Sequence, residues 1–140
     1  MTIKYNNVFI EDAYTICGNY ENDGPLSKYF DKKYEKDLYF GEKSWEQAEV
    51  HLLKEANTNI LKKNKLKEED IDLLISGDLQ NQIAASNYMA REFNIPFLGI
   101  FEACSTSGEG LAIGSTYIEG GFAKKILVST FNCEVEPIFI

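Results

Sequence analysis

The sequence is poor in the residues that build disulfide frameworks and metal centres. Its 140 residues include three cysteines and one histidine. Cys17, Cys104 and Cys133 lie far apart and form no CxxC pair, so we expect reduced thiols. His51 is the single histidine, which leaves a zinc site short of ligands. We therefore predict no metal site and no bound cofactor.

Positive charge and long apolar runs are also scarce. The chain has 14 Lys and Arg residues against 22 Asp and Glu residues, a net charge of −8. This balance opposes binding to phosphate backbones and anionic lipids, and we exclude nucleic acid as a partner. No apolar run approaches the roughly 20 residues of a membrane-spanning helix. Residues 1–7 lack the apolar segment of a secretory signal, so we expect a cytoplasmic protein without signal peptide or transmembrane segment.

The composition is otherwise that of an ordinary globular domain. With 44% hydrophobic residues, a chain of this length buries a substantial core. A first strand is predicted over residues 3–10. Residues 11–37 are polar and contain turn signals, and we interpret them as a long loop packed by its own aromatic side chains.

A helix is predicted to begin after Ser44. Ser44 and Gln47 have the spacing of a capping box, which satisfies two unpaired backbone donors. His51 lies off the apolar stripe of this helix and is interpreted as solvated or half-buried, without a visible partner that would make it a general base. The stripe itself consists of Trp45, Ala48, Leu52, Ala56 and Ile60.

Strands and helices then alternate. This order predicts an α/β fold, a βαβαβαβ unit with a mostly parallel sheet covered by helices. The later strands are expected over residues 71–77, 97–101 and 125–130, and the later helices over residues 82–93 and 105–119.

The two later helices differ in how they are expected to pack. Gly108, Gly110 and Gly114 each weaken the last helix by about 1 kcal/mol relative to alanine. Close packing against neighbouring backbones would recover this loss, so we expect that helix to be deeply buried. The inner face of the helix over residues 82–93 is expected to comprise Ala85, Tyr88, Met89 and Phe93.

Ligands of open α/β sheets gather beyond the carboxyl ends of the strands. Two segments take that place here. After the strand over residues 71–77, Asp78, Asn81 and Gln82 either orient a polar ligand or cap the next helix. After the strand over residues 97–101, Cys104 lies where the next helix starts, and helix N-termini favour thiolates.

The role of Cys104 stays open on the residues alone. Most buried cysteines are packing residues. A thiol nucleophile also needs a base, which these 140 residues do not supply, and the nearby Glu102 opposes thiolate formation.

Motifs spread along the chain resemble those of the stage V sporulation protein AD family, within the thiolase-like superfamily. They lie at residues 24–31, 41–46, 77–82 and 95–107. The resemblance implies two similar βαβαβαββ halves in a five-layered arrangement, of which residues 1–140 would be the N-terminal half-domain. It also places Cys104 at the position of the superfamily's nucleophile, while the partners of that nucleophile would lie in the second half.

The resemblance further implies a function in spore formation. The family is expected to bind dipicolinic acid, as its calcium chelate, for uptake into the developing spore. Other stage V sporulation membrane proteins would be partners, and the protein would then lie in the cytoplasm or at the inner spore membrane. A homodimer would form through the strand over residues 97–101, at the sheet edge; the alternative is that this apolar strand lies in the interior of the sheet. The residues expected to bind ligand are Asp78, Asn81, Gln82, Phe101, Cys104 and Ser105.

Two alternatives remain at this stage. One is an acyl-transferring condensing enzyme, in which Cys104 holds an acyl thioester. The other is a non-functional truncated remnant, which would expose apolar surface. Glu102 stands where the family pattern has glycine, and Phe131 where it has histidine, with further departures at Pro137 and Ile138. This decay of the pattern predicts a truncated or frameshifted copy, or an excerpt of a longer chain.

Overall fold

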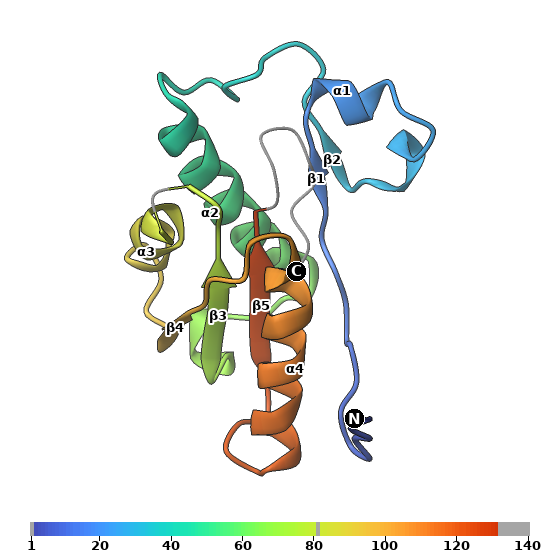
Figure 1. Cartoon of the computed structure of the whole chain (residues 1–140), viewed down its shortest axis with the longest axis vertical. Helices are drawn as coiled ribbons and strands as arrows, with labels where there is room; N and C mark the ends of the chain where they lie inside the picture. The colour runs from blue at the N-terminus through green and yellow to red at the C-terminus, as the bar shows by residue number, and fades with distance from the viewer. Residues whose placement is uncertain (1, 81, 132–140) are drawn as a thin grey trace.

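A parallel three-stranded sheet forms the centre of the computed structural model, which describes residues 2–80 and 82–131 (Figure 1). Its order is β4-β3-β5, with β3 (Leu73–Gly77) between β4 (Phe97–Gly99) and β5 (Ile126–Thr130). Leu74 pairs with Phe97 on one side and Leu127 on the other. The three strands run in the same direction, so their carboxyl ends meet at one end of the sheet. The three strands predicted after residue 70 and the α/β fold class are confirmed.

Helices cover both faces of this sheet. Alternate side chains of a strand point to opposite faces. Ser129 faces α2 (Trp45–Lys63), where it accepts a hydrogen bond from Asn57. Ser76 faces α3 (Ala84–Ala90), where it bonds Ser86. Val128, one residue away, faces α4 (Thr106–Glu119). Within the described residues, no helix combines the length and hydropathy needed to cross a bilayer.

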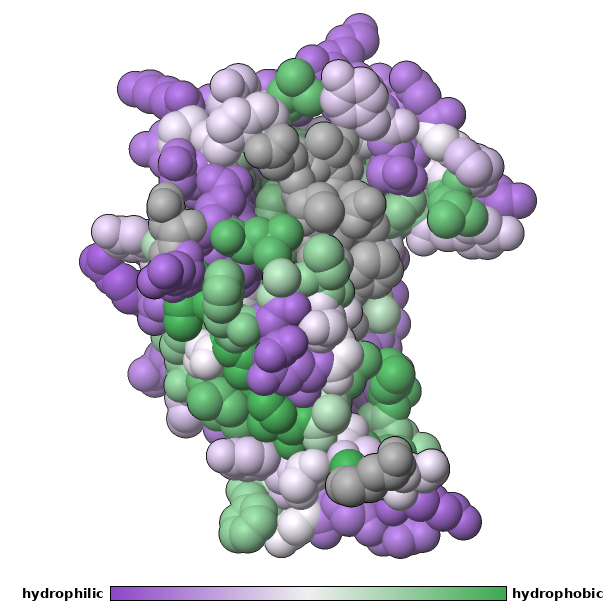
Figure 2. Space-filling view, in the orientation of Figure 1, coloured by the Kyte–Doolittle hydropathy of each residue, from purple (hydrophilic) through white to green (hydrophobic). Residues whose placement is uncertain are grey.

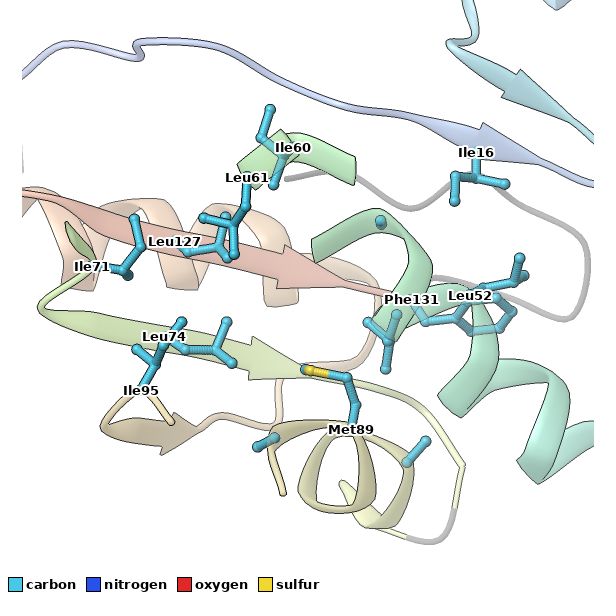
Figure 3. Close-up of a cluster of buried hydrophobic side chains, with 14 of the residues drawn as sticks. Ile16, Leu52, Ile60, Leu61, Ile71, Leu74, Met89, Ile95, Leu127 and Phe131 are labelled. Atoms are coloured by element: carbon cyan, nitrogen blue, oxygen red, sulfur yellow. The ribbon is translucent and has the colours of Figure 1, made fainter. Parts of the chain in front are cut away.

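The core lies between the sheet and α2 with α3 (Figure 3). Ser44 caps α2 as predicted, its hydroxyl accepting from the Gln47 backbone N–H at 3.3 Å. The Gln47 side chain accepts from the Lys43 N–H, so the second bond of the box is shifted by one residue. Trp45 is half-buried and packs on Tyr39, with ring centroids 4.5 Å apart. The rest of the predicted stripe is buried: Ala48, Leu52, Ala56 and Ile60.

The helix α3 is shorter than predicted. Gln82 and Ile83 have positive φ values, 53° and 65°, which delays the helix until Ala84. Ala85 and Met89 are buried, four residues apart on the inner face. The prediction for Tyr88 was wrong: this ring is 59% exposed and lies against the Arg91 guanidinium instead. Phe93 packs against the core from beyond the helix end, where it is half-buried.

The glycines of α4 do permit a close approach to the sheet, but deep burial of this helix was wrong. A Cβ on Gly110 would lie 2.6 Å from Val128 Cγ1. Gly108 faces open space, and Leu111 and Tyr117 are exposed. Figure 2 shows apolar surface interrupted by polar residues on the face that includes α4. One side of α4 packs on the sheet, while Leu111 and Tyr117 on its other sides stay exposed.

The strand predicted over residues 3–10 is absent. This segment runs beside α4 in an extended course without strand pairing (Figure 1). The backbone N–H groups of Asn6 and Asn7 donate to the Glu119 carboxylate at 3.1 and 3.2 Å. A strand requires the carbonyl groups of a neighbouring backbone as acceptors, and here the Glu119 side chain accepts these hydrogen bonds instead. Phe9 is consequently 82% exposed, as one of several large apolar side chains at the surface.

Residues 11–37 are mostly loop, as predicted, with short regular pieces. The parallel pair β1 (Ile16–Cys17) and β2 (Lys32–Lys33) crosses the segment. Polar contacts hold it in addition to aromatic ones: the Thr15 N–H donates to Asp31 at 2.9 Å, while Tyr29 is exposed. The remaining short helices are α1 (Asn19–Asn22), η1 (Ser27–Tyr29), η2 (Glu68–Asp70) and η3 (Ala103–Ser105).

Candidate functional site

Two turns meet beyond the carboxyl ends of β3 and β4, as the parallel sheet requires. Gly77, the last residue of β3, makes the contact possible. A Cβ at this position would lie 2.3 Å from the Ile100 carbonyl oxygen and 2.6 Å from Thr106 Cγ2. Thr130 of β5 donates its hydroxyl to the Gly77 carbonyl at 3.1 Å. Glycine is therefore needed where β3, β5 and the start of α4 come together.

Cys104 lies in η3, directly before α4, and is exposed. The predicted place at a helix start is confirmed, and the thiol is not part of the hydrophobic interior. Ala103 has a φ of 48°, a left-handed conformation that is uncommon for alanine. Thr106 stabilises it by donating its hydroxyl to the Ala103 carbonyl at 2.7 Å. The backbone strain and its support both lie at the residue that precedes the cysteine.

The other residues predicted on this turn also reach the surface. Phe101 is 52% exposed, and Ser105 is exposed with its hydroxyl donating to the Glu102 carbonyl at 2.9 Å. Gln82 is exposed on the neighbouring turn. That turn contacts β4, because a Cβ on Gly99 would lie 2.9 Å from Ile83 Cδ1. Asn81 lies outside the described residues.

Asp78 differs from these residues because it is fully buried. Its carboxylate accepts from the Ser86 backbone N–H at 2.7 Å, near the start of α3. Burial raises its pKa, although the Ser86 side chain and nearby backbone N–H groups act to lower it. The alternative in which Asp78 serves the next helix fits this geometry. Its part in ligand binding stays a prediction.

Glu49 is a buried carboxyl group that sequence reasoning missed. It is fully buried on α2, and neither carboxyl oxygen has a hydrogen-bond partner among the described residues. Burial, and secondly the charge of Asp78, raises the pKa of Glu49 to about 8. The sequence does hold a signal for this burial: Leu53, four residues later on the same face of α2, is also fully buried.

A buried row of hydrogen-bonded polar side chains leads from α2 to the turn that holds Asp78. Asn57 Nδ2 donates to Ser129 Oγ at 3.1 Å, and Ser129 Oγ donates to Ser76 Oγ at 3.1 Å. Ser76 Oγ continues the row to Ser86 Oγ at 3.4 Å. Ser86 is the residue whose N–H reaches Asp78. The row thus links α2, β5, β3 and α3 to the turn after β3.

His51 has the partners that sequence reasoning did not find. Its Nδ1 lies 3.0 Å from a Glu42 oxygen, and its Nε2 lies 3.3 Å from the Tyr34 hydroxyl. These contacts engage both ring nitrogens outside the turn that holds Cys104. Over residues 2–80 and 82–131, no group of three or more His, Cys, Asp or Glu side chains is placed to hold a metal ion.

The chain matches a known family over almost its whole length. The family model of stage V sporulation protein AD matches residues 1–139. The stage V sporulation protein AD of Bacillus subtilis (strain 168) is 48% identical over 123 residues, which cover 88% of this chain and 36% of that protein. The chain therefore spans about a third of the length of this curated relative.

Solved structures of two enzymes share the fold at low sequence identity. The 3-oxoacyl-[acyl-carrier-protein] synthase III from Aquifex aeolicus VF5 superposes with a TM-score of 0.57 at 18% identity, over 91% of this chain and 50% of that one. The corresponding synthase III from Xanthomonas oryzae pv. oryzae gives a TM-score of 0.55 at 16% identity, over 90% of this chain and 44% of that one. The chain thus has a thiolase-like fold and belongs to the stage V sporulation protein AD family.

Proposed function

We propose that the protein binds dipicolinic acid, as its calcium chelate, for uptake into the developing spore. The observation that carries this proposal is the exposed group Phe101, Cys104 and Ser105 at the start of α4 in a chain of a sporulation family. In this proposal the strand-to-helix turn is the floor of the ligand site. The neighbouring turn with Gln82 forms a second wall.

The chemistry of the ligand matches these groups. Dipicolinate is a small planar dianion, and the N–H groups at a helix start favour anions. The exposed ring of Phe101 offers an apolar wall to its planar face, while Gln82 donates to its carboxylates. The net charge of −8 repels a free dianion. Local N–H donors or a bridging calcium ion are therefore needed, and a neutral chelate meets less repulsion than the dianion.

Assembly is part of the same proposal. β4 ends the strand order β4-β3-β5 of the described sheet, so its outer edge offers backbone groups to a second copy. We propose a homodimer through β4, acting with other stage V sporulation membrane proteins in the cytoplasm or at the inner spore membrane. Size-exclusion chromatography with light scattering tests this arrangement. A monomer at micromolar concentration contradicts the dimer.

Acyl transfer is the second candidate, favoured by the exposure of Cys104 beside the strained Ala103. In this reaction the Cys104 thiolate attacks the thioester carbonyl of an acyl-coenzyme A. The carbon–sulfur bond to coenzyme A breaks, coenzyme A leaves as its thiolate and takes a proton from solvent, and Cys104 keeps the acyl group. Mass spectrometry after incubation with acyl-coenzyme A tests it: a stable adduct on Cys104 supports transfer, and an unmodified cysteine excludes it.

Calorimetry with dipicolinate, with and without calcium, tests the binding proposal. Phe101→Ala is expected to weaken binding about tenfold, because the variant loses an apolar wall of aromatic size. Phe122→Ala is the matched control, since this ring is 80% exposed beyond the other end of α4. Equal affinity of both variants, or absence of binding by the unchanged protein, contradicts the proposed site.

A further inference from the structure

A cluster of five side chains fastens residues 32–42 to α2, outside the candidate ligand site. We call it the fastening cluster. Three members come from the segment and two from the middle of α2, so the cluster joins parts of the chain that local sequence does not bring together. Its members are Lys32, Tyr34, Glu42, His51 and Glu55.

The proton of the Tyr34 hydroxyl is committed to Glu55. The two oxygens lie 2.7 Å apart, a distance that requires a proton between them. Glu55 also bonds the Lys32 ammonium group, so its carboxylate is an acceptor and supplies no proton. Burial, and secondly the bond to Glu55, raises the pKa of Tyr34, which keeps the hydroxyl protonated.

This commitment fixes the roles of both His51 nitrogens. Tyr34 has no second proton to donate, so the contact of 3.3 Å to Nε2 requires a proton on Nε2. The Glu42 carboxylate only accepts, so the contact of 3.0 Å to Nδ1 requires a proton on Nδ1. A neutral imidazole has one N–H, and only the imidazolium ion has both. The complete cluster therefore selects the charged form of His51.

We propose that His51 is a proton-controlled latch: uptake of one proton from solvent completes both hydrogen bonds and fastens residues 32–42 to α2. Loss of the proton leaves one N–H for two acceptors, and the segment is then held by one bond fewer. Histidine gains and loses its proton between about pH 5 and pH 8.

The other charged groups around His51 are largely balanced and do not replace the Glu42 contact. Lys54 pairs with Glu92 at 2.8 Å, and the Arg91 guanidinium lies 5.7 Å from the Tyr88 ring centroid. Those groups come from α2 and from α3 with the residues after it. The titratable groups that face the same groove as His51 are Glu42, Glu46, Lys54, Tyr88, Arg91 and Glu92.

Amide hydrogen exchange at about pH 6 and about pH 8 tests the latch, with rates expressed as protection factors. The reporters are the N–H groups of Tyr34, bonded to the Cys17 carbonyl at 3.0 Å, and Glu42, bonded to the Tyr39 carbonyl at 2.9 Å. Their protection is expected to fall about tenfold at the higher pH, the effect of losing one charge-assisted hydrogen bond. The N–H of Leu74, in the sheet, is the reference for pH-dependent global unfolding, and the fall in protection at the two reporters is measured relative to it.

Two variants separate His51 from other titrating groups. His51→Gln is expected to remove the pH dependence of the reporters, and Lys54→Gln, on the same groove, to retain it. A pH dependence relative to Leu74 that survives His51→Gln overturns the proposal, as does equal protection relative to Leu74 of the unchanged protein at both pH values.

Nitrogen NMR of the His51 ring in the unchanged protein covers the case in which His51→Gln fails to fold. Protons on both ring nitrogens are expected whenever the segment is most protected. An unprotonated ring nitrogen under those conditions overturns the latch.

Discussion

Replacing Glu49 with glutamine is expected to remove a large pH dependence from the stability of the fold. Glu49 is fully buried on α2, and its pKa is raised from 4.5 to about 8 by burial and by Asp78. Glutamine keeps the shape of the side chain and has no proton to lose. The difference in unfolding free energy between Glu49→Gln and the unchanged protein therefore isolates this group.

The sign follows from proton binding in the two states. In the unfolded chain Glu49 ionises as the pH rises above its ordinary pKa of 4.5, while in the folded chain it keeps its proton up to a pH of about 8. The contribution of this protonated carboxyl group to the unfolding free energy is complete below pH 4.5 and is lost as the pH rises through about 8. The loss has an upper bound of about 5 kcal/mol. We expect about 2 kcal/mol, because buried sites behave as if their dielectric constant were about 20.

Urea unfolding between about pH 5 and pH 9 measures this difference. Trp45, the single tryptophan, lies at the start of α2 and reports unfolding by fluorescence. Glu49→Gln is expected to gain about 2 kcal/mol relative to the unchanged protein across this range. Glu35→Gln, at an exposed position, is the control and is expected to show no such trend. A Glu49→Gln difference that stays constant or falls with rising pH refutes the reasoning.

Three further substitutions test the packing around the site. Gly77→Ala is expected to lose about 3 kcal/mol and to displace the Cys104 turn, because its Cβ would meet the Ile100 carbonyl at 2.3 Å. Gly108→Ala places its Cβ in open space, so its unfolding free energy in urea is expected to rise by about 0.5–1 kcal/mol. Equal losses for Gly108→Ala and Gly77→Ala would show that the close approach of Gly77 to the Ile100 carbonyl does not determine the cost. Ser44→Ala removes the cap of α2 and is expected to cost about 1 kcal/mol in the same assay, and no change would show that the cap contributes nothing.

The elements that the sequence predicts correctly are those whose signal is local and repeated. The stripe from Ala48 to Ile60 has helical spacing, and a capping residue precedes it at Ser44. The three strands after residue 70 are apolar runs bounded by helices, so their alternation identifies a parallel sheet. Cys104 follows β4 after a short turn, and this order is enough to place it at a helix start.

The errors concern features that depend on distant parts of the chain. Residues 3–10 have the composition of a strand, but their N–H groups meet Glu119, more than 100 residues away, instead of a neighbouring strand. Tyr88 has helical spacing with the buried Ala85, yet the ring lies outward against Arg91. The network around His51 joins α2 to a loop that no periodicity connects with it.

The candidate site shows the same division. The residues on the turns after β3 and β4 follow from the rule that ligands gather beyond the carboxyl ends of strands. The need for glycine at position 77 does not, because it arises from the Ile100 backbone and the Thr106 side chain. Glu49 lies on α2, outside both turns, and its protonation depends on its burial and on the charge of Asp78.

Titration of the isotopically labelled protein with calcium dipicolinate, followed by amide chemical shifts, tests the central claim most directly. Binding at the start of α4 is expected to shift the amides of residues 101–106 and of Gln82, while those of β1 and β2 stay unchanged. Saturating ligand that shifts no amide on these two turns, or shifts amides only elsewhere, contradicts the proposed site.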